Sequence, residues 1–293
     1  MKSLIWSFHF LIVMKYKILK VLHLNKVKKE SFRILLYHDV SNEIEGRFVN
    51  QIRSCTKSWE FIDPKLIGKF VGTSGLATGH NVMLTFDDGF ASDFRIAQEI
   101  LNPRGIKAVF FVIPQFLDLR DEIEQKDFIS RQLYPGVSNR RVPQKLRSMN
   151  WEQVALLHKQ GHTIGSHTYS HKKLSEISDL EELSFEIIQS GKVIGDLIGE
   201  PVKHFAFTFG NLSSISHRAL EIARANYEFV YSGLHGSNSS LVSQSILRRE
   251  TIHPWDPKGF ELAILSGAAD FRSSKSLLIL DNMFQNNLVV NSH

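Results

Sequence analysis

Short apolar runs alternate along this chain with longer segments in which apolar residues recur every three or four positions. The runs are typical of buried strands, and the longer segments are typical of amphipathic helices. We predict strands at residues 33–38, 82–86, 107–113, 162–166, 205–209, 229–232 and 246–252. Gly or Pro follows several of the helical segments, which we predict at residues 63–71, 92–101, 151–160, 180–198, 216–225 and 258–265. This alternation indicates an α/β fold with a largely parallel sheet.

Two stretches depart from this rhythm. Residues 117–148 are rich in charge and contain the pair Pro135-Gly136, so we predict an inserted loop region that shapes access to a site. Residues 270–293 show weak periodicity and are predicted to form a C-terminal tail. One catalytic domain is therefore predicted for residues 32–269.

The first 31 residues combine an apolar part with a basic part. Residues 4–14 are apolar apart from Ser7 and His9, a length that resembles the apolar part of a signal peptide and is short for a membrane span. Lysines follow this segment, and a small-residue cleavage site does not. We therefore predict that residues 1–31 form a leader or a membrane-proximal segment, with peripheral membrane contact through residues 1–30.

Composition narrows the class of protein only slightly. With 293 residues, 43% of them hydrophobic and 22% charged, the chain can bury a core of the size found in α/β barrels. The net charge of +5 permits anionic partners without specifying one, and we expect no nucleic acid partner. Cys55 is the single cysteine, which excludes an intrachain disulfide and a cysteine-based metal site.

Two acids and two histidines carry the chemistry of this sequence. Asp87 and Asp88 directly follow the predicted strand 82–86, at the end of a strand where α/β folds place their chemistry. Neighbouring carboxylates repel each other, and a cation relieves that repulsion. His167 and His171 have an i, i+4 spacing, which a helical turn or a tight loop brings to a common point.

A divalent metal held by Asp88, His167 and His171 would keep an open coordination position. That arrangement activates water or polarises a carbonyl group. Asp87, left off the metal, would act as the base that takes a proton from the attacking water.

Hydrolysis of an amide needs an acid and oxyanion donors as well. We expect His38, at the end of the predicted strand 33–38, to protonate the departing amine. A backbone N–H in the turn Thr208-Phe209-Gly210 would contact the oxyanion, so Phe209 and Gly210 are the substrate-contact candidates. The sequence has no Gly-x-Ser-x-Gly run that would indicate a serine nucleophile.

These motifs resemble those of the polysaccharide deacetylases of carbohydrate esterase family 4, also called the NodB-like family. Residues 85–89, Thr-Phe-Asp-Asp-Gly, are similar to the first motif of the family, and residues 166–171, Ser-His-Thr-Tyr-Ser-His, are similar to the second. The surroundings of these motifs are similar too, at residues 34–40, 151–167 and 205–210.

The resemblance implies a fold, an activity and a set of roles. The fold would be a single-domain, distorted (β/α) barrel, and the reaction would be hydrolytic removal of acetyl from an N-acetylated sugar. Asp87 would be the catalytic base, and Asp88, His167 and His171 would bind a divalent metal. Zinc is the expected metal, with cobalt, nickel and manganese as alternatives.

The third motif departs from the family pattern. Ala206 stands where the family often has Arg, and Thr208 stands where it often has Pro. The orientation of the base then needs another cation, and we expect Arg249, on a later predicted strand, to hold Asp87 ionised.

The acid motif also departs from the common pattern. The late Leu-x-Leu-x-His motif of the family is reproduced near the other end of the chain, at Ile34-x-Leu36-x-His38. This placement resembles the circularly permuted members that act on exported poly-N-acetylglucosamine. His253 is the alternative acid.

We therefore predict a metal-dependent deacetylase whose partner is an N-acetylated glycan. The alternatives are a catalytically silent glycan-binding domain of the same fold and a related amide hydrolase that acts on a small or lipid-linked substrate. A non-haem iron oxygenase also uses two histidines and one carboxylate, but such sites generally lie on antiparallel strands. The predicted location is bacterial, at the cell envelope or inner membrane, with the cytoplasm as the alternative.

Overall fold

The computed structural model of this chain describes residues 2–22, 31–71, 79–239 and 246–280. The chain divides into two compact units. Unit 1 comprises Met1–Leu36, Ser41–Leu84 and Gly233–His293, and unit 2 comprises Tyr37–Val40 and Thr85–Ser232. Parts of the predicted leader (23–30) and tail (281–293), and Gly72 after a predicted helix, lie outside the described residues.

The strands of unit 1 gather around two long ones, β1 (Ser31–Tyr37) and β3 (Asn81–Phe86), whose last residues count with unit 2. β2 (Glu60–Phe61) pairs in parallel with β3, and β9 (Glu250–Thr251) pairs in parallel with β1. β8 (Asn238–Ser239) pairs with β1 in the antiparallel direction. Every residue of β1 and β3 is buried, which explains why their sequences read as near-continuous apolar runs.

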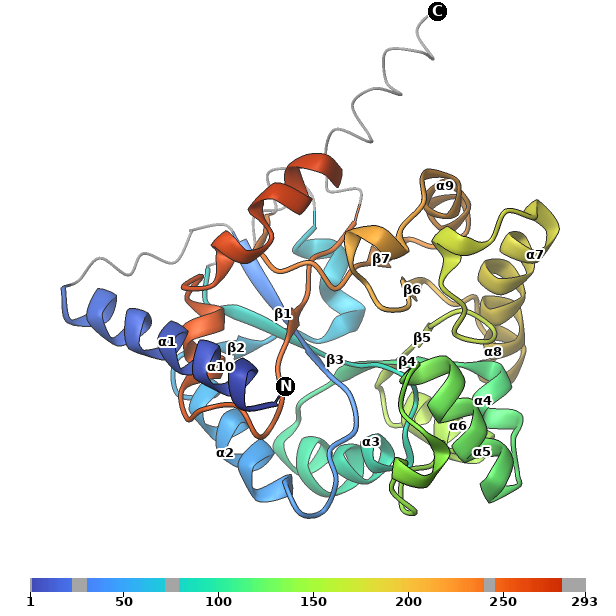
Figure 1. Ribbon diagram of the computed structural model, residues 1–293, viewed down its shortest axis with the longest axis horizontal. Coiled ribbons are helices and arrows are strands. Elements are labelled where there is room, and N and C mark those ends of the chain that lie inside the picture. The colour runs from blue at the N-terminus through green and yellow to red at the C-terminus, as the bar shows by residue number, and fades with distance from the viewer. Residues whose placement is uncertain (1, 23–30, 72–78, 240–245, 281–293) are drawn as a thin grey trace, which may run out of the picture. The chain divides into compact units, whose positions relative to one another are not determined.

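The labelled helices of unit 1 are α1 (Lys2–Val21), α2 (Glu45–Cys55) and α10 (Phe260–Leu265), with 3₁₀ turns at Pro64–Lys69 and Asp270–Arg272. Residues 274–280, within the predicted C-terminal tail, are helical as well. α10 packs against both α1 and α2 (Figure 1). In the part of the chain that the structure describes, no helix is long and apolar enough to cross a membrane.

Unit 2 holds four parallel strands side by side in the order β7, β6, β5, β4. Their bounds are β4 (Ala108–Val112), β5 (Thr163–Ser166), β6 (His204–Ala206) and β7 (Phe229–Tyr231). Gly165 is needed in β5 because a Cβ there would collide with the ring of Phe111 on β4. The close approach of these strands therefore depends on a residue without a side chain.

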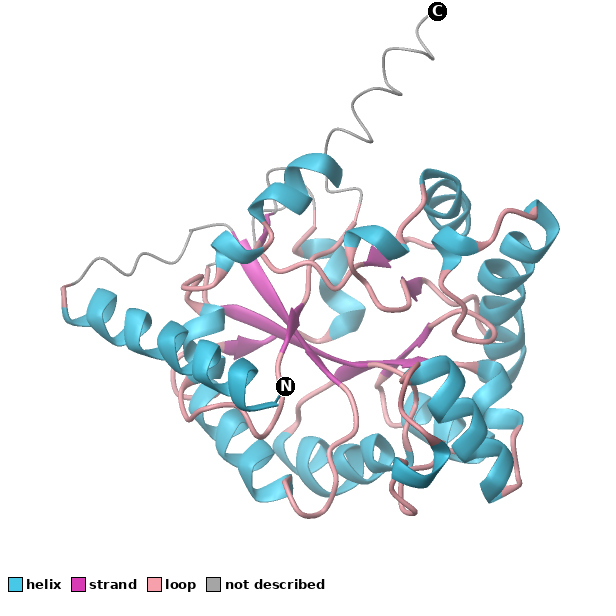
Figure 2. Cartoon of the chain, viewed as in Figure 1, coloured by secondary structure: helices cyan, strands magenta, loops and turns pink. Residues whose placement is uncertain are grey.

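Helices cover the strands of unit 2 (Figure 2). α6 (Trp151–Lys159) and α8 (Ser190–Ile198) pack against β5, and α9 (His217–Asn226) packs against β7. The predicted helix 180–198 is continuous: α7 (Leu180–Ser184) passes through a π-helical turn into α8. α3 (Ala91–Ile96) continues through a π-helical turn (Ala97–Leu101) into a 3₁₀ turn (Asn102–Arg104), which ends at Gly105.

The segment predicted as an inserted loop region is instead helical over about half of its length. It contains the end of α4 (Pro114–Asp118), then α5 (Glu122–Phe128) and helical turns at Ile129–Leu133 and Asn139–Arg141. Phe128 stacks on Phe116 at 5.0 Å between ring centroids, and both lie in one buried apolar cluster with Phe90. The loop prediction failed because the charged residues lie on the outer side of a segment whose apolar side chains are buried.

Other elements differ from the sequence prediction in extent. α2 was not predicted, since only Phe48, Ile52 and Cys55 mark its buried face as apolar. The predicted strand 246–252 shortens to β9, and the predicted helix 63–71 is a 3₁₀ turn.

Candidate active site

The two adjacent acids lie in a tight turn at the end of β3. The Asp87 N–H donates to the carbonyl of Tyr37, the last residue of β1, at 3.0 Å. Asp88 has φ of 76°, a left-handed conformation that costs energy for a residue with a Cβ. Both residues are only 2% exposed. The backbone therefore holds two carboxylates in a buried position where water stabilises neither of them.

The loop after β5 places the two histidines together. The His167 N–H donates to the carbonyl of Val112 at 3.0 Å, which fixes the start of the loop. Thr168 and His171 have φ of 62° and 61°, and the Thr168 hydroxyl oxygen accepts the His171 N–H at 2.9 Å. The chain thus turns back on itself within one motif, and His171 returns to the neighbourhood of His167.

Backbone strain is concentrated at this site. Within the described residues, the non-glycine positions with positive φ are Asp88, Thr168, His171 and Phe209. All four belong to the motifs that sequence analysis connected with catalysis. Strained residues persist where the surrounding structure over-determines them, and they cluster at functional sites.

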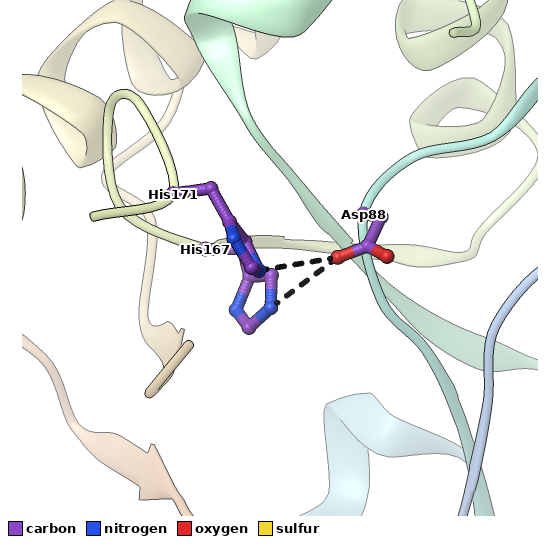
Figure 3. Close-up of side chains that lie close together, drawn as sticks. All are labelled: Asp88, His167 and His171. Atoms are coloured by element: carbon purple, nitrogen blue, oxygen red, sulfur yellow. Dashed lines mark ion pairs between the residues drawn. The ribbon is translucent and has the colours of Figure 1, made fainter. Parts of the chain in front are cut away.

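Asp88, His167 and His171 converge on one point (Figure 3). Asp88 Oδ1 lies 3.5 Å from His171 Nε2 and 3.6 Å from His167 Nε2. The three ligand atoms all lie within 4.8 Å of one another. Metal–ligand bonds of about 2.0–2.1 Å in a tetrahedron separate the ligand atoms by about 3.4 Å. The observed spacing therefore fits a metal ion better than it fits direct hydrogen bonds.

Each histidine is held by a backbone carbonyl behind it. His167 Nδ1 lies 2.8 Å from the carbonyl oxygen of Ala206, and His171 Nδ1 lies 2.9 Å from that of Gln132. A carbonyl only accepts, so Nδ1 carries the hydrogen in both rings. Both Nε2 atoms then present a lone pair toward Asp88, as metal-ligating histidines do.

Electrostatics keeps His171 in the form that binds metals. Burial, together with a smaller contribution from the nearby His167, lowers its pKa to about 3. His171 is therefore neutral over the physiological pH range, and a neutral imidazole is the ligand that a metal needs. Two nitrogens and one carboxylate oxygen suit zinc and the divalent ions near it.

A third buried carboxyl group, that of Asp93, lies near the two adjacent aspartates. Asp93 is fully buried; its Oδ2 accepts the Phe90 N–H at 3.1 Å, and its Oδ1 has no hydrogen-bond partner within the described residues. Burial raises the pKa of Asp93 well above its usual range, and the charges of Asp39 and Asp88 raise it further. A bound cation would relieve this accumulation of negative potential.

The predicted base and acid belong to the same cluster. Asp87 Oδ2 lies 3.7 Å from His167 Nε2, close to the ligands, and Asp87 is outside the converging set of three. His38 follows the last residue of β1, and its charge is among the smaller influences that lower the pKa of His171 after burial. The structure thus places Asp87 and His38 in unit 2, on the same side as Asp88, His167 and His171, and the roles of Asp87 and His38 stay predictions.

Arg249 and His253 belong to unit 1. Arg249 is 1% exposed, and its backbone N–H donates to the carbonyl of Leu234 at 3.1 Å. The ring of His253 stacks on Trp255 with 4.2 Å between centroids. The backbone N–H of His253 donates to Asp256 Oδ2 at 2.7 Å. Their roles as base-orienting cation and alternative acid stay predictions.

The third-motif turn contributes Phe209 to the site. Phe209 has φ of 59° and is 41% exposed, and its ring meets the His171 ring edge-on at 4.9 Å. The Gly210 N–H already donates to the Thr208 carbonyl at 2.6 Å. The Phe209 N–H is therefore the better oxyanion candidate of the two. The Thr208 hydroxyl donates to the Lys172 carbonyl at 2.7 Å, so the residue that replaces Pro fastens this turn to the histidine loop.

Sequence analysis missed Glu186, which supports the histidine loop from the helix above. Its carboxylate accepts the Ser170 N–H at 2.9 Å and also the Ser170 hydroxyl, and its carbonyl accepts the Tyr169 N–H at 2.9 Å. Glu186 is 2% exposed. A signal was present, because Glu186 lies three residues after Leu183 and four before Ser190, on the buried face of the helix.

A pocket of about 690 Å³ opens beside His171 and Phe209. Charged and polar side chains form most of its wall, among them Arg131, Lys172, Lys173, Glu176, Glu182 and Asn211. Its volume is that of pockets that bind small-molecule ligands. Many hydrogen-bonding groups around one exposed aromatic ring suit a sugar better than an apolar ligand.

A family model and a curated relative that match this chain carry the same description, polysaccharide deacetylase. The family model described as polysaccharide deacetylase matches residues 75–230, slightly more than half of the chain. The chain is 19% identical over 233 residues to YxkH of Bacillus subtilis (strain 168), a protein provisionally named as a polysaccharide deacetylase. That match covers 78% of this chain and 73% of YxkH.

Two solved structures share the fold. The Streptococcus pyogenes deacetylase PplD, in complex with acetate, matches with a TM-score of 0.62 and 18% identity, over 81% of this chain and 99% of PplD. IcaB from Ammonifex degensii matches with a TM-score of 0.61 and 18% identity, over 82% of this chain and 98% of IcaB. These likenesses confirm the predicted fold class, the distorted α/β barrel of such deacetylases.

Proposed function

Because this chain belongs to the polysaccharide deacetylase family, we propose that it is a metal-dependent hydrolase that removes N-acetyl groups from an N-acetylated glycan. One observation carries the proposal: three buried ligand atoms converge on a point beside a fourth side chain, Asp87, that is outside the set. A binding module has no use for a second carboxylate placed next to a metal site but outside its set of ligands. A hydrolase needs one as its base.

Asp88, His167 and His171 would hold a divalent ion, and we take zinc as the metal. Such an ion would supply a Lewis acid that polarises the acetyl carbonyl and makes water more acidic. Asp87 takes the proton as water attacks the carbonyl carbon. The buried position of Asp87 keeps bulk water away from its carboxylate.

The other groups of this mechanism act on the products of that attack. The Phe209 N–H donates to the developing oxyanion from the third-motif turn. His38 gives a proton to the nitrogen of the sugar as the C–N bond breaks, so the amine leaves neutral. Acetate and a free amino sugar are the products.

Support for the substrate class comes from the pocket and from the relatives. The pocket beside His171 and Phe209 has the volume and the polar wall that a sugar unit requires. The PplD structure contains acetate, which is the product this reaction would release. We place the enzyme at the cell envelope of a bacterium, where N-acetylated glycans are built and exported.

The test is release of acetate from N-acetylglucosamine oligomers by zinc-reconstituted protein. We expect release to be abolished by a chelator and restored by added zinc. Asp87→Asn should retain its zinc and lose about 10²–10⁴-fold in rate, since the base alone is removed. Asp118→Asn, an acid that binds the Trp151 side chain outside the site, is the matched control and should retain full activity.

Each other result would count against the proposal. Full activity in Asp87→Asn would show that Asp87 is not the base. No acetate from any oligomer, despite bound zinc, would favour a different amide substrate or a silent glycan-binding domain. Equilibrium binding of the same oligomers would then separate those two functions.

A further inference from the structure

Helix α1 is fastened to unit 1 by one side only. His9 Nδ1 lies 2.7 Å from Asp256 Oδ1, and the His9 ring stacks on Phe260 of α10 with 4.1 Å between centroids. Ile12 and Val13 are 3% and 2% exposed. These contacts fix the rotation of the helix about its axis, and they leave the opposite side outward (Figure 1).

The outward side of α1 is also apolar. At about 100° per residue, the arc between Lys17 and Lys15 covers roughly 160° of the helix surface. The large side chains within this arc, which we call the apolar face, are Phe10, Leu11, Met14, Ile18 and Val21. Their exposed fractions run from 39% at Met14 to 76% at Val21. Soluble proteins rarely expose so many large apolar side chains together, and such patches mark interaction sites.

A cationic pocket lies at one edge of the apolar face. It has a volume of about 560 Å³, and its basic side chains are Arg47, Arg53, Lys57 and Lys258. All four are exposed, and in the described chain none of them forms an ion pair or a side-chain hydrogen bond. Trp6 lines this pocket and stacks on Phe10 with 5.7 Å between ring centroids. The pocket and the apolar face therefore share a boundary.

The acids of the pocket do not neutralise these cations. The Asp256 carboxylate is engaged by His9 and by the His253 N–H. Glu261 is 2% exposed, and burial raises its pKa, which disfavours its charged form. The four basic side chains thus present an uncompensated positive surface to whatever approaches α1.

We propose that the apolar face of α1 and the cationic pocket dock unit 1 onto an anionic phospholipid bilayer, with the helix axis in the plane of the surface. Apolar side chains enter the acyl region, Lys17 at one edge extends toward headgroups, and Trp6 lies at the boundary with the cationic pocket. Lys15 at the other edge donates to the Ala268 carbonyl at 3.0 Å and stays with unit 1. Among the described residues no helix is long and apolar enough to span a bilayer. This inference does not rest on the proposed hydrolase activity.

Charge distinguishes a bilayer from a second copy of the chain. In a two-fold dimer through α1, the same cationic side chains of both copies would approach each other and repel. Phosphate groups of anionic lipids instead attract each basic side chain, and each such side chain near the surface contributes roughly 1 kcal/mol, or about fivefold in partitioning. The combination of an apolar stripe and free cations is therefore complementary to an anionic membrane.

The test is co-sedimentation of the full chain with vesicles of phosphatidylcholine alone or of phosphatidylcholine mixed with phosphatidylglycerol. We expect binding to the mixed vesicles and little binding to the neutral ones. Leu11→Glu with Ile18→Glu should lower partitioning at least about tenfold, because two charges would enter the acyl region. Leu180→Glu with Ile123→Glu changes the same residue types at exposed sites of unit 2 and should bind as the wild type does.

A second pair of variants tests the cationic pocket. Arg47→Gln, Arg53→Gln and Lys57→Gln together should lower partitioning about tenfold or more, and added salt should shrink that difference. The matched control replaces three exposed basic residues of unit 2 by Gln, namely Arg140, Arg141 and Lys159.

Three results would overturn the proposal. The first is equal vesicle binding by the Leu11→Glu, Ile18→Glu variant and the Leu180→Glu, Ile123→Glu control. The second is equal binding of the wild type to neutral and to mixed vesicles. The third is a stable dimer in light scattering that the Leu11→Glu, Ile18→Glu variant no longer forms. Because all the substituted residues are exposed, circular dichroism should show that every variant is folded. Binding by chelator-treated protein should equal that of the zinc-loaded protein, which separates this test from the test of hydrolysis.

Discussion

Glu250 in unit 1 and Asp88 in unit 2 are both buried carboxylates, yet their neighbours differ in kind. Glu250 Oε1 lies 2.5 Å from Arg33 Nη1, and Oε2 lies 2.8 Å from His235 Nδ1. Asp88 Oδ1 instead faces two histidine nitrogens at 3.5 and 3.6 Å, beyond hydrogen-bond distance. A carboxylate that contacts its cation directly is part of the structure. A carboxylate whose neighbouring nitrogens lie at 3.5 and 3.6 Å has the spacing of two ligands on one metal ion.

The surrounding charge supports the same distinction. Arg33 also contacts Asp270, at 2.7 and 2.8 Å, and these acids raise its pKa although burial opposes the shift. In unit 2 the pKa of Asp93 rises because of burial and the charges of Asp39 and Asp88. The unit 1 cluster is therefore balanced by the protein itself, whereas the unit 2 cluster gains from an added cation.

Removing the cation of the balanced cluster should have the largest effect on folding. Arg33→Leu leaves Glu250 buried without its arginine, and breaking a buried pair in this way costs about 3–5 kcal/mol of unfolding free energy. Urea denaturation of the zinc-free protein measures this loss. Arg140→Leu, at an exposed residue, is the control and should lower the free energy of unfolding by less than about 0.5 kcal/mol. If zinc affinity fell in Arg33→Leu while stability did not, the two clusters would not be independent.

Removing a ligand from the open cluster should act on zinc instead. His167→Ala should lower zinc affinity by at least about 100-fold, more than the loss of an outer-shell partner. Competition with a chelating dye measures the affinity. His158→Ala, at a partly exposed histidine near Glu200, is the control and should bind zinc as the wild type does. An unchanged zinc content in His167→Ala would exclude this residue as a ligand.

The support for the histidine loop should matter less than the ligands themselves. Glu186→Ala removes the acceptor of the Ser170 N–H and should weaken zinc binding by about 10- to 100-fold. Glu186→Gln keeps an acceptor oxygen and should recover part of this loss. The visible spectrum of the cobalt-substituted protein reports ligand geometry, and it should change in Glu186→Ala only. Glu182→Ala, an exposed acid on the same helix, should leave both measurements unchanged.

A buried histidine outside both clusters should affect stability only in acid, so its effect at neutral pH is the smallest of the four. Burial lowers the pKa of His204 to about 3, with a further contribution from Lys203, whereas an unfolded chain protonates histidine near pH 6.5. Between these pH values the unfolded state binds more protons, so the free energy of unfolding falls as pH falls, by up to about 1.4 kcal/mol per pH unit. The contribution of His204 is complete above about pH 6.5.

Denaturation at a series of pH values tests this effect. His204→Gln lacks the titrating ring, so its stability should depend less steeply on pH between about 6 and 4 than that of the wild type. Parallel profiles for the two proteins would contradict the lowered pKa. The His204 hydrogen bond with Tyr231 at 2.8 Å will also be altered, and this change should displace the whole profile without changing its slope.

Local pattern was sufficient for several parts of this protein. The apolar run before Asp87 and the return of histidine at i, i+4 are visible in the sequence, and the structure places Asp88, His167 and His171 together. α6, α9 and the continuous helix through Glu186 match their predicted ranges closely. These elements are recognisable because their buried positions recur with the period of one helix or follow one strand.

Long-range contacts were hidden from such a pattern. The carbonyls that hold His167 and His171 belong to Ala206 and Gln132, each 39 residues away along the chain and in opposite directions. Gln132 lies in the segment predicted as a loop, which became helical because its apolar side chains pack on Phe90 and Phe116. Nothing local distinguishes a carbonyl that accepts from a histidine from one that does not.

The sequence by itself determined the α/β alternation, the family, and the types of side chain at the site, because these depend on local periodicity and on residue identity. The tertiary structure alone decided which ring nitrogens carry hydrogen, how far Asp88 stands from the histidines, and which side of α1 faces outward. These properties depend on distances between residues far apart in the chain. Only packing fixes such distances, since burial and backbone hydrogen bonds act on the folded chain as a whole.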